Sequence, residues 1–369
     1  MKRILFYIEP WTEITPDFRV GAFKDAVYQI NLLRKHAPEL DCRLLIGENT
    51  WHFIRSSGFD DHGETPISVL FLDDLRQAFK TGKAAAEAFM GDVMGPQESA
   101  YLARISRQAL GNFVPDIILM HETHAPFLSH AYPNALVLHG MYGMTYRMPF
   151  PRLTALDPQG LYHRSLLATE ADEVRRLEVT SQEHETLRET RNWFLAQSVP
   201  HDPVWPFVRA EQARFDKLLL VPLQVDGYYA FDSCCAFNNQ EEFLEAVLAK
   251  VPQNWGVIAT EHSEYQPSLD PLAVSRLKTS HPHLIYREDI NSVPYVSQCL
   301  LPHVDAVVSV SSSIALQALL VDIPVVTAGH SHINAAATCG LGIVVLAPEA
   351  MIALAGFGLA GLGLALVFP

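Results

Sequence analysis

The chain has 369 residues, of which 49% are hydrophobic and 18% charged, so it can form a large core and is not expected to be disordered. Its length predicts two domains. A net charge of −14, with no long run of lysine or arginine, argues against sequence-independent nucleic-acid binding, which depends on neutralising phosphates.

Short apolar segments alternate with amphipathic ones over the first half of the chain. The apolar start is short and is interrupted by Glu9 and Pro10, so we expect a first strand rather than a signal peptide. The predicted strands are Ile4–Ile8, Cys42–Ile46, Ser68–Leu72, Asp116–Met120 and Ala135–Leu138, and the predicted helices are Phe23–Lys35 and Ala100–Leu110. This alternation is typical of a parallel sheet that is covered by helices.

The middle of the chain contains a polar helix followed by a boundary. Thr180–Gln197 has helical character, and Thr180 and Ser181 are suited to cap its first turn. Three prolines lie between 198 and 206, which is typical of a linker. We therefore expect a first domain over 1–200 and a second over 207–340.

The second half repeats the alternation more clearly. The predicted strands are Lys217–Leu223, Gly256–Thr260, Leu284–Tyr286, Asp305–Val310 and Ile323–Thr327, and the predicted helices are Asn239–Val251 and Ser312–Leu320. Two such domains predict a cleft between the carboxyl ends of two sheets, where ligands bind in folds of this kind. The predicted class is therefore α/β, with two Rossmann-like domains that face each other across a cleft.

The carboxyl-terminal segment 341–369 has an unusual composition. Its last part, Met351–Pro369, contains nineteen uncharged residues and is long enough to span a bilayer. No lysine or arginine flanks it, so a buried helix, a truncated chain or an altered reading frame is favoured over a membrane span.

The chain contains five cysteines, an odd number without paired spacing. This pattern argues against a disulfide framework. We expect free thiols in a reducing cytoplasm.

Three serines follow the strand predicted over Asp305–Val310 and begin the next helix. Amides and hydroxyls at a helix N-terminus favour an anion such as phosphate. Capping requires only one serine, so Ser311, Ser312 and Ser313 together favour a phosphate site over capping alone. The sequence contains neither a P-loop nor a dinucleotide-binding fingerprint.

Two further polar residues follow strands of the second domain. His262 could donate a hydrogen bond to a phosphate or sugar hydroxyl, although a surface-loop histidine is an equal alternative. Arg287 could bind a carboxylate or phosphate with two hydrogen bonds, or it could form a surface ion pair with Glu288 or Asp289.

The loop after the first strand of the second domain carries two carboxylates, Asp226 and Asp232. Asp232 lies between Phe231 and Ser233 and could serve as a nucleophile or base. The alternative is that Asp232 caps the following turn.

In the first domain, polar loops could line the other wall of the cleft. They carry His121, Glu122, His124 and Asp157. No third ligand lies at a diagnostic spacing from the two histidines, and the chain has no Asp-x-Asp, so we expect no metal.

A specific arrangement occurs along the second half: a Gln224…Asp232-Ser233 loop, then Glu261-His262 after a strand, then Ser311-Ser312-Ser313 before a helix. Over about residues 215–335 this resembles the carboxyl-terminal half of a GT-B glycosyltransferase. More narrowly, it resembles the retaining β-Kdo transferases of bacterial surface polysaccharides, of the WbbB type found in O-antigen assembly and of relatives in capsule assembly.

The resemblance implies CMP-Kdo as donor, a polysaccharide or lipid-linked glycan as acceptor, and no metal or other cofactor. It implies transfer with retention through a covalent sugar–aspartate intermediate, and Asp232 matches the nucleophile. Ser311, Ser312 and Ser313 would hold the CMP phosphate. The other implied donor contacts are Gln224, Ser233, His262 and Arg287. The base that activates the acceptor stays open among Glu122, His124 and Asp157.

Two other functions remain open from the residues. One is a GT-B enzyme that uses another nucleotide sugar, including an epimerase, and the other is a catalytically inert glycan-binding domain. We expect a cytoplasmic location, with peripheral association at the inner face of the membrane and further modules of a longer chain as open alternatives.

Overall fold

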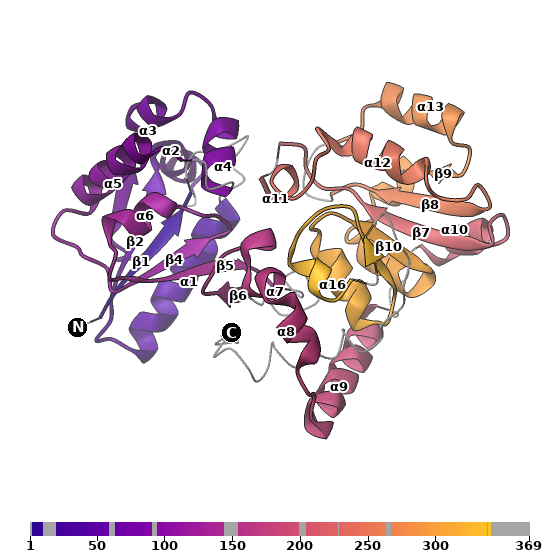
Figure 1. The fold of residues 1–369 in the computed structure, drawn as a ribbon, viewed down its shortest axis with the longest axis horizontal. Helices are drawn as coiled ribbons and strands as arrows, with labels where there is room; N and C mark the ends of the chain where they lie inside the picture. The colour runs from indigo at the N-terminus through magenta and orange to yellow at the C-terminus, as the bar shows by residue number, and fades with distance from the viewer. Residues whose placement is uncertain are drawn as a thin grey trace. The chain divides into compact units, whose positions relative to one another are not determined.

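The computed structural model describes residues 2–9, 20–58, 63–90, 94–143, 154–198, 204–227, 229–262, 267–337 and 339–340. The chain divides into two compact units (Figure 1). The first comprises Met1–Met141, Leu156–Leu161 and Gly227–Tyr229, and the second comprises Tyr142–Ala155, Tyr162–Asp226 and Ala230–Pro369.

The first unit contains a six-stranded sheet in the order β3-β2-β1-β4-β5-β6. Its strands are β1 (Arg3–Ile8), β2 (Asp41–Gly47), β3 (Ile67–Leu70), β4 (Ile117–His121), β5 (Leu136–Tyr142) and β6 (Thr154–Asp157). The pairs β1–β2, β1–β4, β2–β3 and β4–β5 are parallel. The predicted strands of this half are confirmed, with ends that differ by a few residues.

Both faces of this sheet are covered by helices. These are α1 (Val20–His36), α2 (Glu48–Ser56), α3 (Leu72–Ala78), α4 (Gly82–Met90), α5 (Pro96–Leu110) and α6 (Pro126–Ala131). Successive side chains of a strand point to opposite faces. Accordingly, Ile4 and Phe6 of β1 pack with residues of α1 and α2, whereas Leu5 and Tyr7 pack with residues of α5 and α6. The uninterrupted apolar sequence of β1 follows from burial on both sides.

The boundary between the units lies earlier than the predicted division into 1–200 and 207–340. Four helices precede the second sheet: α7 (Leu166–Thr169), α8 (Ala171–Arg176), α9 (Ser181–Ser198) and α10 (Trp205–Gln212). Phe194 of α9 is fully buried in the core of the second unit, and Leu187 and Leu195 pack against the same core. These three apolar residues form a stripe on an otherwise polar helix, so α9 belongs to the second unit rather than ending the first.

The second unit contains another six-stranded sheet, in the order β12-β11-β10-β7-β8-β9. Its strands are β7 (Lys217–Pro222), β8 (Trp255–Thr260), β9 (Leu284–Ile285), β10 (Ala306–Ser309), β11 (Val325–Thr327) and β12 (Cys339–Gly340). All five neighbouring pairs are parallel. Every predicted strand of this half is present.

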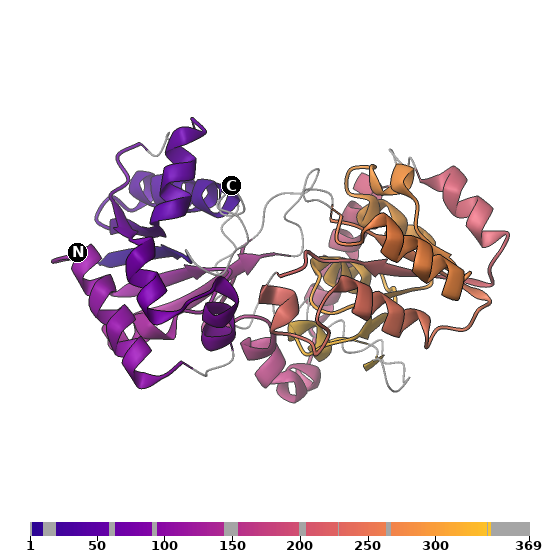
Figure 2. The ribbon, with the colours of Figure 1, turned by 90° about the horizontal axis from the view of Figure 1, so that it is seen from above.

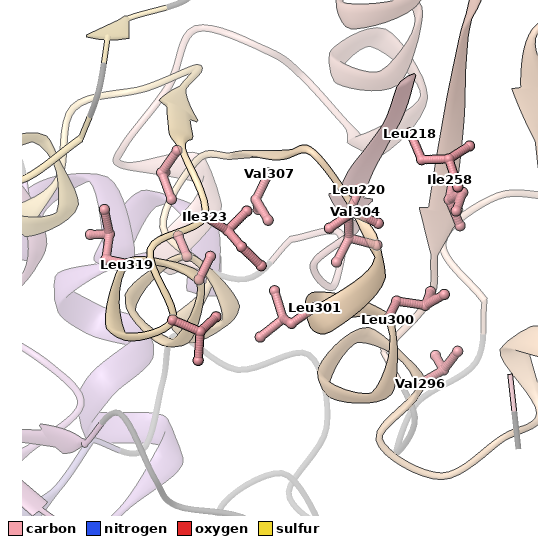
Figure 3. Packing of buried hydrophobic residues seen from close by; sticks show 14 of the residues in the cluster. Leu218, Leu220, Ile258, Val296, Leu300, Leu301, Val304, Val307, Leu319 and Ile323 are labelled. Carbon is pink, nitrogen blue, oxygen red and sulfur yellow. The ribbon is translucent and has the colours of Figure 1, made fainter. Parts of the chain in front are cut away.

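The helices between these strands complete the layers. They are α11 (Tyr229–Asp232), α12 (Gln240–Leu248), α13 (Pro271–Ser280), α14 (Glu288–Asn291), α15 (Val296–Leu300) and α16 (Ser313–Leu320), with short 3-10 helices at Tyr162–Arg164, Leu301–His303 and His332–Ala335. Figure 3 shows one core of this unit, where Leu218 and Leu220 of β7 lie among residues of β8, β10, α15 and α16. Figure 2 shows each sheet between layers of helices.

In both units, chain order and spatial order are related in the same way. The first strand of each sheet, β1 or β7, lies between the second and the fourth. This is the Rossmann order, and ligands bind in such sheets at the carboxyl ends of the strands where the order reverses. The loops after β7 and β10 are therefore the first place to look for a site in the second unit.

The predicted apolar tail at 341–369 lies outside the described residues. Within the part of the chain that the structure describes, no helix is both long and apolar enough to cross a bilayer.

Candidate functional site

Gln224 and Ser311 bring together the loops that follow β7 and β10. Gln224 Nε2 donates to Ser311 Oγ over 2.9 Å, and the Ser311 amide donates to Gln224 Oε1 over 3.2 Å. Both residues are buried. Two of the positions predicted for donor binding therefore lie side by side, and their side chains hold the two loops to each other.

The serine cluster begins α16 as predicted, and its members have different local roles. Ser312 is the N-cap residue, and its Oγ accepts from the Ile314 amide over 3.4 Å. Ser309 Oγ accepts from the Ser312 amide over 3.1 Å. Ser313, the first helical residue, is exposed. Capping and loop contacts thus account for Ser309, Ser311 and Ser312, which leaves Ser313 as the most accessible hydroxyl of the cluster.

Asp232 ends the one-turn helix α11 in the loop after β7 and is half-buried. The preceding Phe231 is fully buried, with its ring centroid 6.2 Å from that of Phe243. Burial raises the pKa of the neighbouring Cys235 thiol, and the charge of Asp232 raises it further. The carboxyl group of Asp232 therefore lies at the carboxyl edge of the sheet, in surroundings between solvent and core.

The segment around Asp232 is held by the loops after β10 and β11. Ser311 Oγ donates to the Ala230 carbonyl over 2.7 Å, and the His330 amide donates to the Cys234 carbonyl over 2.7 Å. A Cβ atom added at Gly329 would collide with the same Cys234 carbonyl. Burial raises the pKa of the Cys234 thiol to about 12, so this cysteine stays protonated and serves in packing.

The first residue after β8, Glu261, is a buried carboxylate that sequence reasoning did not assign. Its oxygens accept from the Ser268 amide (3.0 Å), the Leu269 amide (3.3 Å) and the Tyr286 hydroxyl (3.0 Å). Burial raises the pKa of Glu261, while these hydrogen bonds lower it and the nearby Asp226 raises it. In the sequence, only the position of Glu261 directly after an apolar strand indicated that it could be a buried carboxylate. The half-buried His262 follows it.

Asp226, the other carboxylate of the loop after β7, lies at the start of α12. Its Oδ1 accepts from the Gln240 amide over 2.8 Å. Burial raises its pKa, and this hydrogen bond lowers it. A carboxylate at this place also interacts favourably with the helix dipole, so Asp226 stabilises α12.

Arg287 forms the surface ion pair that the sequence left as the alternative to a donor contact. Its Nε donates to Asp289 Oδ1 over 2.9 Å, and its guanidinium lies 5.4 Å from the ring centroid of Phe207. The side chain is 48% exposed. This hydrogen-bonded arginine holds the pKa of Asp289 below its usual range. We therefore leave Arg287 out of the site proposed below.

Glu122 follows β4 in the first unit, at the topological place that corresponds to the loop after β10. It is buried, and its backbone is left-handed, with a φ of 52°. Its amide donates to the Gly140 carbonyl over 2.6 Å. A left-handed backbone is unusual for glutamate, and such strain often accompanies functional positions.

The two other base candidates contribute to turns of the first unit. His124 Nε2 accepts from the Leu161 amide over 2.9 Å, so its ring proton is on Nδ1 in the neutral form. Asp157 Oδ1 accepts from the amides of Gln159 and Gly160 over 2.8 and 3.0 Å, which is the geometry of an Asx turn. These contacts give His124 and Asp157 structural roles in the first unit, and the base stays open among the three residues.

Among the described residues, no group of three or more His, Cys, Asp or Glu side chains could hold a metal ion. Cys42, Cys234, Cys235 and Cys299 are free thiols, as predicted. A surface pocket of about 200 Å³ lies elsewhere, before the strands β7, β8 and β9, and is lined by Arg214, Phe215, Gln253, Pro282 and His283. None of the predicted site residues lines it.

Comparisons with solved structures show the fold. The chain is similar to the Thermosulfurimonas dismutans KpsC β-Kdo 2,7 transferase, with a TM-score of 0.50 and 14% identity over 96% of this chain and 90% of that one. It also matches the β-Kdo 2,4 transferase of KpsC from the same organism, with a TM-score of 0.45 and 15% identity over 65% of this chain and 79% of that one. A UDP-GlcNAc 2-epimerase from Methanocaldococcus jannaschii matches with a TM-score of 0.38 and 13% identity over 96% of this chain and 91% of that one. The first of these matches confirms the predicted GT-B-like class of two Rossmann-like units.

The match to a known protein family lies almost entirely within the second unit. No curated protein matches the chain. Residues 180–337 match the family model described as "Capsule polysaccharide biosynthesis protein". The matched segment runs from α9 to the end of the loop after β11 and contains every residue that the sequence assigned to donor binding, together with Asp232.

Proposed function

We propose that the protein is a glycosyltransferase of capsule polysaccharide biosynthesis that transfers Kdo from CMP-Kdo to a growing glycan with retention. The observation that carries the proposal is the family match over 180–337, because this segment holds both Asp232 and the serine-headed helix α16 at one edge of a sheet. The fold shared with a β-Kdo transferase is compatible with it. The description of the matched family favours a capsule over an O-antigen acceptor.

The donor is held by its charges. CMP-Kdo carries a phosphodiester and a sugar carboxylate. The amides at the start of α16 and the hydroxyl of Ser313 bind the phosphate, since a helix N-terminus favours an anion. His262 donates to the phosphate or to a sugar hydroxyl. This balance needs no divalent cation.

The reaction proceeds by two displacements at the anomeric carbon. The Asp232 carboxylate forms a bond to this carbon, and the bond to the phosphate oxygen breaks, so that CMP leaves with the electron pair. An acceptor hydroxyl then loses its proton to a base, for which Glu122, His124 and Asp157 are the candidates, and attacks the same carbon while the bond to Asp232 breaks. Two inversions give net retention, as in retaining glycosidases. The Asp232 carboxylate stabilises the positive charge that develops on the sugar, and the amides at the start of α16 stabilise the negative charge on the departing phosphate.

Mass spectrometry of the intact protein tests the nucleophile. Incubation with CMP-Kdo and no acceptor should add one Kdo to the wild-type protein and none to Asp232→Ala. Asp226→Asn is the matched control, because it changes a carboxylate of the same loop but keeps the oxygen that accepts from the Gln240 amide. An adduct that persists in Asp232→Ala, or that is lost only in Asp226→Asn, removes Asp232 from this role.

A donor panel tests the substrate. CMP-Kdo should raise the melting temperature by mass action more than UDP-sugars do, and EDTA should leave the release of CMP unchanged. Stabilisation by another nucleotide sugar alone would contradict the Kdo assignment. Binding without any release of CMP would indicate an inert glycan-binding domain instead.

A further inference from the structure

We infer that Gln224 and Glu261 are positioning residues, which join the loops at the carboxyl edge of the second sheet into one hydrogen-bonded network. The network itself does not depend on the proposed function. Its effect on catalysis does, because the loops that it joins carry Asp232, His262 and the start of α16.

The Gln224 side chain forms one half of the network. Its amide group is bonded to both the hydroxyl and the backbone amide of Ser311, and Ser311 Oγ continues to the Ala230 carbonyl over 2.7 Å. Ala230 lies two residues before Asp232 in the same short helix. A displacement of Gln224 would therefore move the start of α16 and the segment of the proposed nucleophile together.

The Gln224 backbone extends the network in two other directions. Its amide donates to Gln240 Oε1 over 2.9 Å, and its carbonyl accepts from Ser268 Oγ over 2.7 Å. Gln240 is fully buried at the start of α12. Gln224, in the loop after β7, thus contacts the loops after β8 and β10 and the first turn of α12.

Glu261 forms the other half. It accepts from the Ser268 and Leu269 amides and from the Tyr286 hydroxyl, so it ties the far end of the loop after β8 to the end of β9. Ser268 is shared by both halves, because its amide bonds to Glu261 and its hydroxyl bonds to Gln224. His262, the residue next to Glu261, begins the loop that this carboxylate closes.

The network follows the order of the sheet. It runs from Tyr286 after β9, through Glu261 and Ser268 after β8 and Gln224 after β7, to Ser311 after β10, and β9-β8-β7-β10 are neighbours in space. Buried hydrogen bonds reinforce one another, and a missing partner leaves a costly unsatisfied group. The two halves should therefore loosen together rather than one at a time.

Hydrogen exchange tests this coupling without any substrate. The variants are Gln224→Met, which keeps the side-chain length, and Glu261→Gln, which replaces one acceptor oxygen by a donor. In each variant, amides in peptides that contain Ser268 and Ser311 should exchange about fivefold to 150-fold faster, since the loss of a buried hydrogen bond removes roughly 1–3 kcal/mol of protection. If each substitution affects only the peptide that it contacts, the loops are independent and the inference is wrong.

Milder variants keep the test valid if those two fail to fold. Ser268→Ala removes the hydroxyl that joins the halves, and Ser268→Thr should restore it. Ser275→Ala is the matched control, because it removes an exposed serine–carbonyl bond within α13, outside the network. Faster exchange at Ser311 in Ser268→Ala but not in the control supports the network, whereas equal behaviour of the two overturns it.

The kinetic measurement separates this inference from the proposed function. With CMP-Kdo, Ser268→Ala should lower kcat by about tenfold to a hundredfold, because small misplacements of reacting groups slow the chemical step, and KM should change by less than about threefold. Coupled exchange without turnover of CMP-Kdo by the wild-type protein would refute the proposed function and leave the network standing. Turnover of CMP-Kdo together with uncoupled exchange would support the proposed function and refute the network.

Discussion

The two sheets share one strand order but differ in the loop that follows their fourth strand. After β10, Ser311 is bonded to Gln224 of the neighbouring loop and to the Ala230 carbonyl. After β4, the corresponding place is taken by Glu122, buried and in a left-handed backbone. Topology therefore decides where polar residues gather, whereas the loop side chains decide what those residues can do.

Two helices of each unit also differ in how they begin. In the first unit, α2 and α5 begin after Gly47 and Gly95, which provide no side-chain cap. In the second, α12 and α16 begin after Asn239 and Ser312, whose side chains accept from backbone amides. At α12 and α16 the second unit therefore depends on specific polar side chains at the carboxyl edge of its sheet.

The largest expected effect concerns His332, in the loop after β11. It is buried, its ring nitrogens make no hydrogen bond with described residues, and burial lowers its pKa to about 4. As the pH falls below about 6.5, His332 becomes protonated in the unfolded chain but stays neutral in the folded protein. The free energy of unfolding should therefore fall by about 3 kcal/mol as the pH is lowered from 6.5 to 4.

Chemical denaturation across this pH range provides the measurement. His332→Leu should remove the corresponding part of the pH dependence, while its stability at pH 7 should change little because an unbonded polar group is replaced by an apolar one. If the free energy of unfolding depends on pH in the same way in the variant and the wild-type protein, His332 is not the source of this pH dependence.

The next effect compares one glycine from each unit. Gly329→Ala places a methyl group against the Cys234 carbonyl and 2.8 Å from Val310 Cγ1, so overpacking should cost about 1–3 kcal/mol. Gly58→Ala, in the first unit, meets nothing within 4 Å but has a φ of +75°, so only backbone strain of about 1 kcal/mol is expected. Measuring the free energy of unfolding of both variants tests whether Gly329→Ala loses more stability than Gly58→Ala. A smaller loss for Gly329→Ala would mean that the loop after β11 relaxes without penalty.

The smallest changes in stability are expected from alanine substitutions at the neighbouring Ser312 and Ser313. Ser312→Ala removes the cap of α16 and should cost about 1 kcal/mol. Ser313→Ala removes an exposed hydroxyl and should leave stability within about 0.5 kcal/mol of the wild-type value. Under the proposed function, only Ser313→Ala should raise KM for CMP-Kdo at unchanged stability. An unchanged KM for this variant would limit the phosphate contact to backbone amides.

Sequence patterns predicted most of the sheet framework, because a strand that is buried on both faces must be continuously apolar, as in β1 and β7. They also predicted helices that begin close to the observed starts of α12 and α16, since helix starts depend on residues a few positions apart. The polar helix α9 was assigned to the wrong unit. Its buried Phe194 identifies the partner only when the second core is present.

The site was predictable in outline and not in detail. Asp232, Gln224 and Ser311 could be placed at the carboxyl edge of a sheet because parallel strands bring their ends together. The burial of Glu261 and the bond between Gln224 and Ser311 could not be predicted, and the sequence left the choice between a donor contact and an ion pair open for Arg287. The reason is physical: strand, helix and cap preferences are properties of neighbouring residues. Whether a polar side chain is buried, and which partner it meets, depends on groups up to 87 positions away that only the packed sheet brings together.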